Sequence, residues 1–159
     1  PFGVMLIGLA FTDERLARIA GLLQPEVRLA VVGAHLTGQP LNSQLLALGA
    51  RFDRTIATAP VYRLHALPTS PPKPGLVRAG QGTGPGEGGA AIEAEVWRLP
   101  AEGLGRLLAA LPRPMALGRV ELADGSHVPG FLCEPAALAD AEDITSYGGW
   151  RAYLGGGRA

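Results

Sequence analysis

The most informative stretch of the chain is Val32-Gly33-Ala34-His35-Leu36-Thr37-Gly38-Gln39-Pro40-Leu41-Asn42, where an apolar segment ends abruptly in glycine and polar side chains. Residues 29–32 are continuously apolar, which predicts a β-strand that is covered on both faces. Gly33 has no Cβ, so the backbone can turn there and approach a ligand closely. Because His35 and Asn42 follow directly, we expect a site beside the end of this strand.

The composition indicates one globular domain with a short additional segment. The chain has 159 residues, of which 47% are hydrophobic and 18% charged, so it can bury a substantial core. The formal net charge is zero and no run of Lys or Arg follows an element, so nucleic-acid binding is not expected. Cys133 is the single cysteine, which excludes an intramolecular disulfide. We expect it to be a small core residue, in a chain compatible with the reducing cytoplasm.

The first 25 residues have a pattern of their own. Residues 1–10 are apolar but have no basic start and no cleavage-site pattern, and they are too few to cross a membrane. A chain that begins at proline inside an apolar run is typical of a piece cut from a longer protein. A helix is predicted from Thr12 or Asp13 to the Gln24-Pro25 boundary. Its apolar stripe, which needs a surface to cover it, consists of Leu16, Ile19, Leu22 and Leu23.

Short strands separated by glycine and proline predominate from residue 26 onward. Strands are predicted at residues 28–32, 51–58, 62–67, 76–78 and 91–99, and a hairpin at 119–122 and 128–133 around Asp124-Gly125. Helices are predicted at residues 41–48 and 102–111, and in two pieces over 140–154 that are separated at Gly148-Gly149. Strands and helices do not alternate regularly, so we expect an α+β fold with a mixed or mostly antiparallel sheet that could curl into a barrel.

Two loops and one strand carry further candidates. Residues 68–74 are rich in proline and predict a rigid loop that holds Lys73. Residues 79–89 are rich in glycine but lack the Lys-Ser or Lys-Thr pair of a phosphate loop, which favours a flexible hairpin tip. Glu93 and Glu95 are two residues apart on a predicted strand and share a face. They form either an acid/base pair or part of a solvated strand face.

Several dispersed motifs together resemble the C-terminal domain of allophanate hydrolase, within the γ-glutamyl cyclotransferase-like fold. Besides the opening stretch, they are Gly49-Ala50-Arg51-Phe52, Ala59-Pro60-Val61-Tyr62-Arg63-Leu64, Pro72-Lys73-Pro74-Gly75-Leu76-Val77-Arg78, Ala91-Ile92-Glu93-Ala94-Glu95-Val96-Trp97, Gly130-Phe131-Leu132-Cys133-Glu134-Pro135, Asp143-Ile144-Thr145 and Gly148-Gly149-Trp150-Arg151-Ala152-Tyr153-Leu154. The resemblance covers nearly all of residues 27–154. It implies an amidase-domain remnant with its linker at residues 1–25, the domain itself at 26–155 and a disordered tail at 156–159.

The resemblance implies a mixed, mostly antiparallel β-barrel flanked by short helices, with a small anion-binding cavity where the first strand meets the following helix. The full enzyme acts in urea degradation, and this domain is expected to decarboxylate N-carboxycarbamate after the amidase step. The serine and lysine of the amidase domain are missing here, so the chain alone would not hydrolyse allophanate. The alternative is a non-catalytic role in assembly with the amidase domain and as a homodimer. Neither a cofactor nor a metal is implied.

N-carboxycarbamate carries two carboxylates on one nitrogen, so its site needs cations and one proton donor. His35 suits the donor, because an imidazole changes protonation near neutral pH. Arg78 and Arg119 could each clamp a carboxylate, and Lys73 would act as a point charge. The other expected substrate-binding residues are Gly33, Ala34, Leu36, Asn42, Tyr62 and Glu93.

Some polar residues keep a second explanation. Asn42 could orient the substrate or cap the helix that begins near Leu41. Gln39 is a weaker candidate as an amide donor, and His65 and His127 are expected to be structural or exposed.

Cyclotransferases of this fold use a Tyr-Gly-Ser opening and a glutamate acid, whereas this chain has Val32-Gly33-Ala34 and no carboxylate at residues 107–111. Cyclotransferase activity is therefore the least favoured alternative, and only Glu93 or Glu95 could replace the missing acid.

Overall fold

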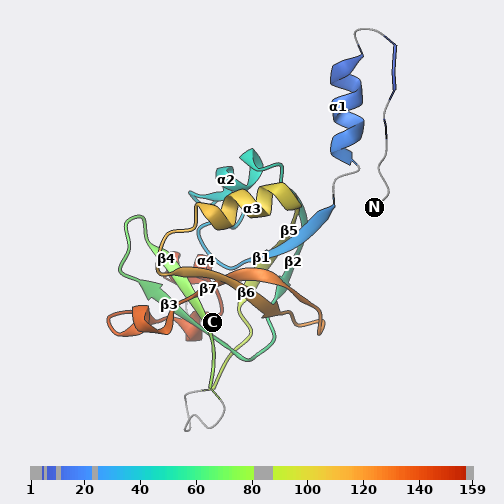
Figure 1. Cartoon of the computed structure of the whole chain (residues 1–159). Coiled ribbons are helices and arrows are strands. Elements are labelled where there is room, and N and C mark those ends of the chain that lie inside the picture. The colour runs from blue at the N-terminus through green and yellow to red at the C-terminus, as the bar shows by residue number, and fades with distance from the viewer. Residues whose placement is uncertain (1–4, 6, 10–11, 23–24, 81–87, 157–159) are drawn as a thin grey trace.

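The computed structural model describes residues 5, 7–9, 12–22, 25–80 and 88–156 (Figure 1). Its strands are β1 (Glu26–Val31), β2 (Arg51–Ala57), β3 (Tyr62–Leu67), β4 (Lys73–Arg78), β5 (Glu93–Pro100), β6 (Met115–Glu121), β7 (His127–Cys133) and β8 (Glu142–Asp143). Its helices are α1 (Asp13–Leu22), α2 (Asn42–Ala47), α3 (Ala101–Ala109) and α4 (Trp150–Leu154), with 3-10 turns η1 (Pro135–Leu138) and η2 (Thr145–Tyr147).

The strands form two sheets. The five-stranded sheet has the order β2-β5-β1-β7-β6, and the three-stranded sheet has the order β4-β3-β8. Central strand β1 runs antiparallel to β5 and pairs in parallel with β7, where Ala30 lies opposite Gly130. Leu29 and Val31 are fully buried, as the continuous apolar run predicts. The end of β1 therefore lies inside the domain, where the candidate site begins.

The expected α+β fold with a mixed sheet is confirmed, but among the described residues the barrel is not closed. Edge strands β2 and β6 meet through one isolated bridge, between Thr58 and Leu122. Pairing cannot continue beyond it because Pro60 has no backbone N–H and the Asp124-Gly125 turn reverses the other strand. The two sheets pack against each other without a continuous hydrogen-bonded ladder between them.

Most of the predicted elements are present within a few residues, and the exception lies near the C-terminus. The helix expected before Gly148 is wrong, because the segment contains β8 and the turn η2 instead. Asp143 pairs with His65 on the edge of β3, and its carboxylate accepts a hydrogen bond from the Thr145 N–H at 2.8 Å. Ile144 donates its N–H to the Leu64 carbonyl and is fully buried. These local and edge contacts satisfy the backbone in place of a helix.

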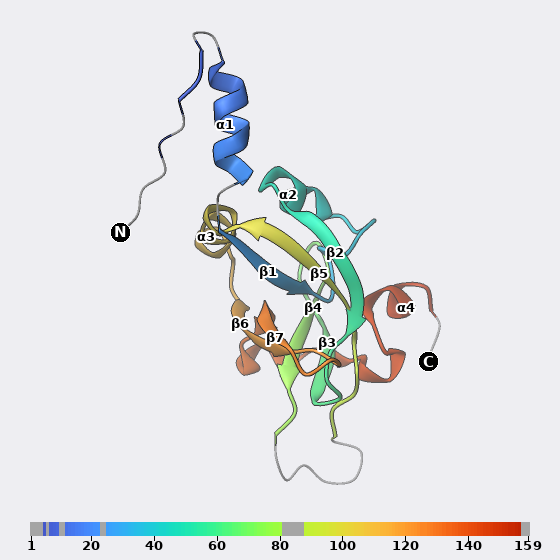
Figure 2. The same cartoon turned by 90° about the vertical axis from the view of Figure 1, so that its right-hand side faces the viewer.

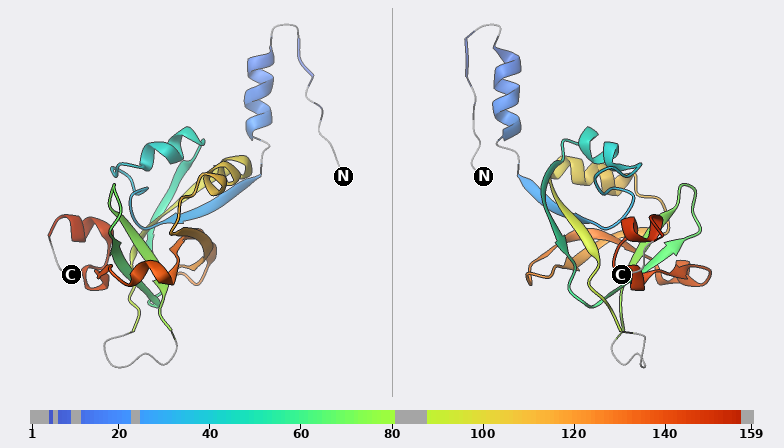
Figure 3. Two further views of the ribbon diagram at one scale, coloured as in Figure 1. Left: turned by 60° about the vertical axis from the view of Figure 1, so that its left-hand side comes forward. Right: turned by 180° about the vertical axis from the view of Figure 1, so that it is seen from behind.

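The helices cover different parts of the domain. Helices α2 and α3 lie beside each other over one end of the five-stranded sheet (Figures 1 and 3). A Cβ on Gly103 of α3 would lie 2.7 Å from the Leu48 carbonyl oxygen, so glycine permits this close approach. Helix α1 stands away from the two sheets in every view (Figure 2). In the described part of the chain, no helix has the length and apolar character needed to span a membrane. The tail expected at residues 156–159 falls, from 157 on, outside the described residues.

Candidate functional site

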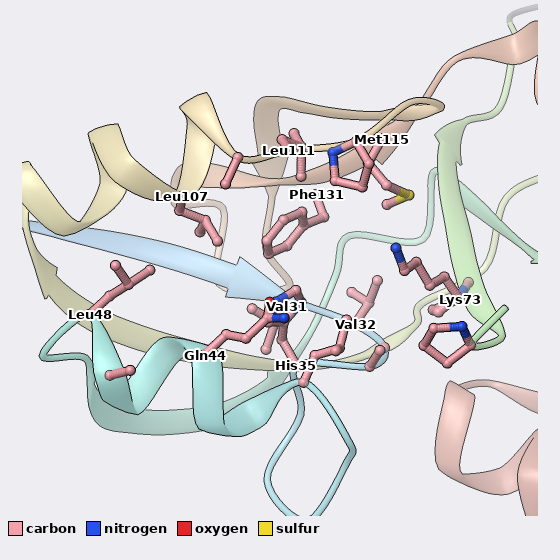
Figure 4. Close-up of a pocket in the computed structure, with 18 of the residues that line it drawn as sticks. Val31, Val32, His35, Gln44, Leu48, Lys73, Leu107, Leu111, Met115 and Phe131 are labelled. Carbon is pink, nitrogen blue, oxygen red and sulfur yellow. The ribbon is translucent and has the colours of Figure 1, made fainter. Parts of the chain in front are cut away.

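A cavity of about 610 Å³ opens at the end of β1, between α2, α3 and the start of β4 (Figure 4). Its polar side chains, within the described lining, are His35, Gln44, Lys73 and Arg106. The other lining residues are Val31, Val32, Gly33, Ala34, Leu41, Ala47, Leu48, Pro71, Pro74, Leu107, Ala110, Leu111, Pro112, Met115 and Phe131. The cavity therefore combines a few polar groups with largely apolar walls, as small-molecule sites commonly do.

Gly33 brings the start of β4 to the end of β1. A Cβ at position 33 would lie 2.0 Å from Cγ of Pro74, so another residue there would push the proline ring away. Pro74 follows Lys73, which begins β4 instead of standing in the middle of a loop. Gly33 thus permits the approach of the segment that carries Lys73 into the cavity.

The loop after Gly33 presents His35. The Leu36 N–H donates to the Gly33 carbonyl at 2.8 Å, and the Leu36 side chain is fully buried. The His35 ring stacks on Phe131 with centroids 4.7 Å apart, and its Nε2 lies 3.2 Å from Oε1 of Gln44. The Asn42 side chain donates to the His35 carbonyl at 2.9 Å, while the cap residue of α2 is Leu41. Asn42 therefore holds the His35 backbone and does not cap the helix.

The surroundings of His35 favour its neutral form. Burial is the main cause that lowers the pKa of His35 below its usual value, and the positive charge of Lys73 lowers it further, against the opposing hydrogen bond with Gln44. An anion bound beside the ring would reverse this preference, because opposite charges stabilise each other. The imidazole is therefore suited to gain a proton when an anionic ligand enters.

We expect the folded chain to lose stability when the pH falls below about 6.5, the ordinary histidine pKa. Burial also lowers the pKa of His65, so the unfolded chain takes up protons at both histidines before the folded chain does. Unfolding is then favoured progressively as the pH falls toward the folded-state values. Urea midpoints measured from about pH 7 to about pH 5 should decrease. The decrease should be smaller in His35→Gln than in the wild type, and a constant midpoint in the wild type would contradict the prediction.

Six of the predicted binding residues are not part of the cavity lining: Leu36, Asn42, Tyr62, Arg78, Glu93 and Arg119. Tyr62 is 1% exposed, and its hydroxyl oxygen accepts the Glu121 N–H at 2.8 Å. Arg78 forms an ion pair with Glu121 at 3.0 Å, and its guanidinium lies 5.7 Å from the centre of the Tyr62 ring. Arg119 is exposed on β6. The structure thus brings together His35, Lys73, Gly33 and Ala34, and places Arg78 with Tyr62 elsewhere.

Glu93 and Glu95 also lie outside the cavity lining, and the solvated face expected for them is wrong at Glu95, which is 3% exposed. Both carboxylates bind Arg151 of α4, with Nη1 2.6 Å from Oε1 of Glu93 and Nη2 2.6 Å from Oε1 of Glu95. The two side chains do share a face, as expected, but that face is covered by the C-terminal segment.

Sequence reasoning missed two polar residues of the cavity, Gln44 and Arg106. Gln44 lies three residues after Leu41 and four before Leu48, so it interrupts an otherwise apolar helix face. Arg106 lies four residues before Ala110 on α3, and its guanidinium pairs with Glu102. A polar residue beside the apolar face of a short helix was the available signal for Gln44, whereas exposed Arg106, paired with Glu102, offered none.

Comparison with known proteins shows the family to which the chain is related. Residues 27–155 match the allophanate hydrolase C-terminal domain family. The urea amidolyase of Lachancea kluyveri is 35% identical over 192 residues, an alignment that includes 97% of this chain and 10% of that protein. The chain thus spans about a tenth of the curated relatives it matches.

Solved structures support the same relationship. Kluyveromyces lactis allophanate hydrolase superimposes with a TM-score of 0.76 and 39% identity, over 83% of this chain and 21% of that one. A uropathogenic E. coli-specific protein superimposes with a TM-score of 0.74 and 34% identity, over 82% of this chain and 97% of that one. An AIG2-like protein from mouse, 19% identical over 72% of this chain and 83% of its own, shares the fold with a TM-score of 0.50. The chain therefore belongs to the family of allophanate hydrolase C-terminal domains.

Proposed function

We propose that this domain decarboxylates N-carboxycarbamate, the dianion that remains after an amidase has removed ammonia from allophanate. The observation that carries the proposal is the presence of His35 and Lys73 in one largely apolar cavity. The relatives named for allophanate hydrolysis and urea amidolysis support the choice of substrate.

The reaction can be written with these residues. The bond between nitrogen and one carboxylate carbon breaks, carbon dioxide leaves, and the electron pair stays on nitrogen. Protonated His35 gives its proton to that nitrogen, which leaves carbamate and a neutral imidazole. Lys73 supplies positive charge toward the dianion, and the exposed Arg106 guanidinium would add to it on exchanging Glu102 for a substrate carboxylate.

The neutral and the protonated forms of His35 both fit these reaction steps. In the empty cavity burial lowers the pKa of His35, and the dianion would favour the charged form that donates the proton. The apolar walls, which include Leu107, Leu111 and Met115, solvate a carboxylate poorly and tolerate neutral carbon dioxide. The cavity therefore favours loss of charge from the substrate.

The proposal is tested by following carbon dioxide release from N-carboxycarbamate that a separate amidase generates from allophanate. The wild-type chain should accelerate release beyond the spontaneous rate, with saturation, and malonate should compete as a stable dicarboxylate of similar shape. The amidase must be in excess, so that decarboxylation limits the rate. A rate equal to the spontaneous one at saturating domain would refute the catalytic function.

A second candidate function, assembly, is favoured by exposed apolar side chains near α1. Met5, Ile7 and Leu9 are each more than 80% exposed, and Ile19 is also exposed. Large apolar groups gathered in this way commonly mark surfaces that bind another protein. We propose that residues 1–25 pack on the amidase domain in a full-length enzyme, and on a second copy when this chain is alone.

Deletion of residues 1–24 should convert a self-associated chain into a monomer, because the deletion removes these exposed side chains. Light scattering measures the mass of both forms. Malonate binding serves as the control and should be retained, since the cavity is built from residues 31–131. An oligomeric state unaffected by the deletion would exclude this role of the segment.

A further inference from the structure

A buried carboxylate anchors the loop that presents His35. Oε2 of Glu95 accepts the Thr37 N–H at 2.8 Å, the Thr37 hydroxyl at 3.0 Å and the Trp97 indole N–H at 3.1 Å. Oε1 of the same side chain accepts Nη2 of Arg151 at 2.6 Å. Thr37 stands two residues after His35, on the part of the loop that faces solvent. We call Glu95, Thr37 and Arg151 the loop anchor.

We propose that Glu95 and Arg151 are positioning residues that hold His35 in the cavity through Thr37, an inference that rests on the proposed function for its catalytic meaning. Arg151 contributes directly as well, because its Nη2 donates to the Thr37 carbonyl at 2.8 Å. Arg151 and Thr37 are 114 residues apart in the sequence, so the C-terminal segment restrains a loop from the first part of the domain. The site is complete only when α4 has packed.

The chemistry of the anchor requires a carboxylate. All four groups around Glu95 are donors, so an amide in its place would direct its own N–H₂ at another N–H or O–H. Burial by itself would raise the pKa of Glu95, but hydrogen bonds from Arg151, Thr37 and Trp97 outweigh it and leave the pKa below its usual value. The side chain is thus charged and fully paired at neutral pH.

Other contacts also hold the loop, and the loop anchor restrains a part that they do not reach. Asn42 holds the His35 carbonyl, and Leu36 is buried in the core. The segment that follows Leu36 turns outward at Thr37 and Gly38, where both residues are exposed. Glu95 and Arg151 bind the N–H, hydroxyl and carbonyl of Thr37, so they restrain this outward segment.

The test is Glu95→Gln in the full chain, with the His35 ring followed by NMR as the pH changes. If the anchor holds His35, the variant should let the ring reach solvent, and the pKa of His35 should rise toward its ordinary value. Exchange of the Thr37 amide hydrogen should become roughly 10- to 100-fold faster, as expected on loss of a hydrogen bond to a charged group. Affinity for malonate should fall about tenfold or more, the scale of one lost charge-assisted contact.

A matched control is Glu142→Gln, which removes a carboxylate that accepts the Tyr153 hydroxyl of α4 at 3.0 Å but lies on the surface. It should leave the His35 titration and Thr37 exchange as in the wild type. If Glu95→Gln does not fold, Thr37→Val removes one anchor hydrogen bond from an exposed position and should shift the His35 pKa in the same direction by less. A wild-type His35 titration in the folded Glu95→Gln or Thr37→Val chain would overturn the proposal.

The titration and the exchange measurement do not depend on catalysis. If the wild-type chain neither binds malonate nor accelerates carbon dioxide release, the decarboxylase proposal fails while the positioning of His35 can still be observed. If the wild-type chain is active and Glu95→Gln retains both its rate and its His35 titration, the positioning proposal alone fails.

Discussion

Replacement of His35 by alanine is expected to lower the acceleration of carbon dioxide release by about 10²- to 10⁴-fold, the usual contribution of a general acid. The variant removes the only imidazole among the described lining residues, whereas Lys73 and Arg106 remain to attract the dianion. The turnover number should therefore fall much more than the affinity for malonate. Initial rates over a range of substrate concentrations, measured with amidase in excess, separate the two effects.

A second variant distinguishes proton donation from packing. The His35 ring stacks on Phe131 and contacts Gln44, so alanine also removes part of the cavity wall. His35→Gln keeps most of the volume and one hydrogen-bonding group but supplies no comparable acid. It should lose the rate to the same extent as His35→Ala and keep more of the malonate affinity. A His35→Gln chain with wild-type turnover would show that another group donates the proton.

Replacement of Arg151 by alanine is expected to destabilise the fold by about 3 kcal/mol, the low end of the cost of breaking a buried ion pair. Glu95 is almost fully buried and would lose the guanidinium that compensates its charge. The three neutral donors from Thr37 and Trp97 remain, which is why we expect the low end of the range. For a chain of this size the melting temperature should fall by roughly 6–12 °C.

The matched control is Arg51→Ala. Arg51 pairs with one glutamate, Glu26, whereas Arg151 pairs with Glu93 and Glu95. The Arg51 side chain is 62% exposed and that of Arg151 is 32% exposed. Exposed pairs contribute about 0–1 kcal/mol, so this variant should unfold close to the wild-type temperature. Thermal unfolding followed by circular dichroism compares the two. Equal shifts for Arg51→Ala and Arg151→Ala would mean that burial of Glu95 adds nothing to the pair.

Local patterns predicted most of the elements. The apolar run at residues 29–32, the alternation at 91–99 and the Asp124-Gly125 turn correspond to β1, β5 and the β6-β7 hairpin. These predictions succeed because burial of one or both strand faces and turn geometry depend on neighbouring residues. The helix expected before Gly148 failed, since pairing with the edge of β3 and the turn at Asp143 compete with helix formation there.

Side-chain partners from distant segments were less accessible to prediction. Arg78 and Arg119 have the chemistry to bind a carboxylate, yet Arg78 pairs with Glu121 and Arg119 lies exposed on β6. Lys73 reaches the cavity because Gly33 accepts the Pro74 ring at close range. Which cation faces the site depends on how two sheets pack, and no local pattern contains that information.

The sequence by itself determined that residues 29–32 are buried, that the strand ends before Gly33 and that a histidine follows in a polar loop. Composition, short-range periodicity and the resemblance of dispersed motifs are sufficient for these statements, because each depends on residues close together in the chain or on a recognised pattern. Tertiary structure alone decided that Glu95 is an anchor and not part of a solvated face. Its role depends on Arg151, 56 residues away, whose charge makes a buried carboxylate stable only after α4 has packed across the strand.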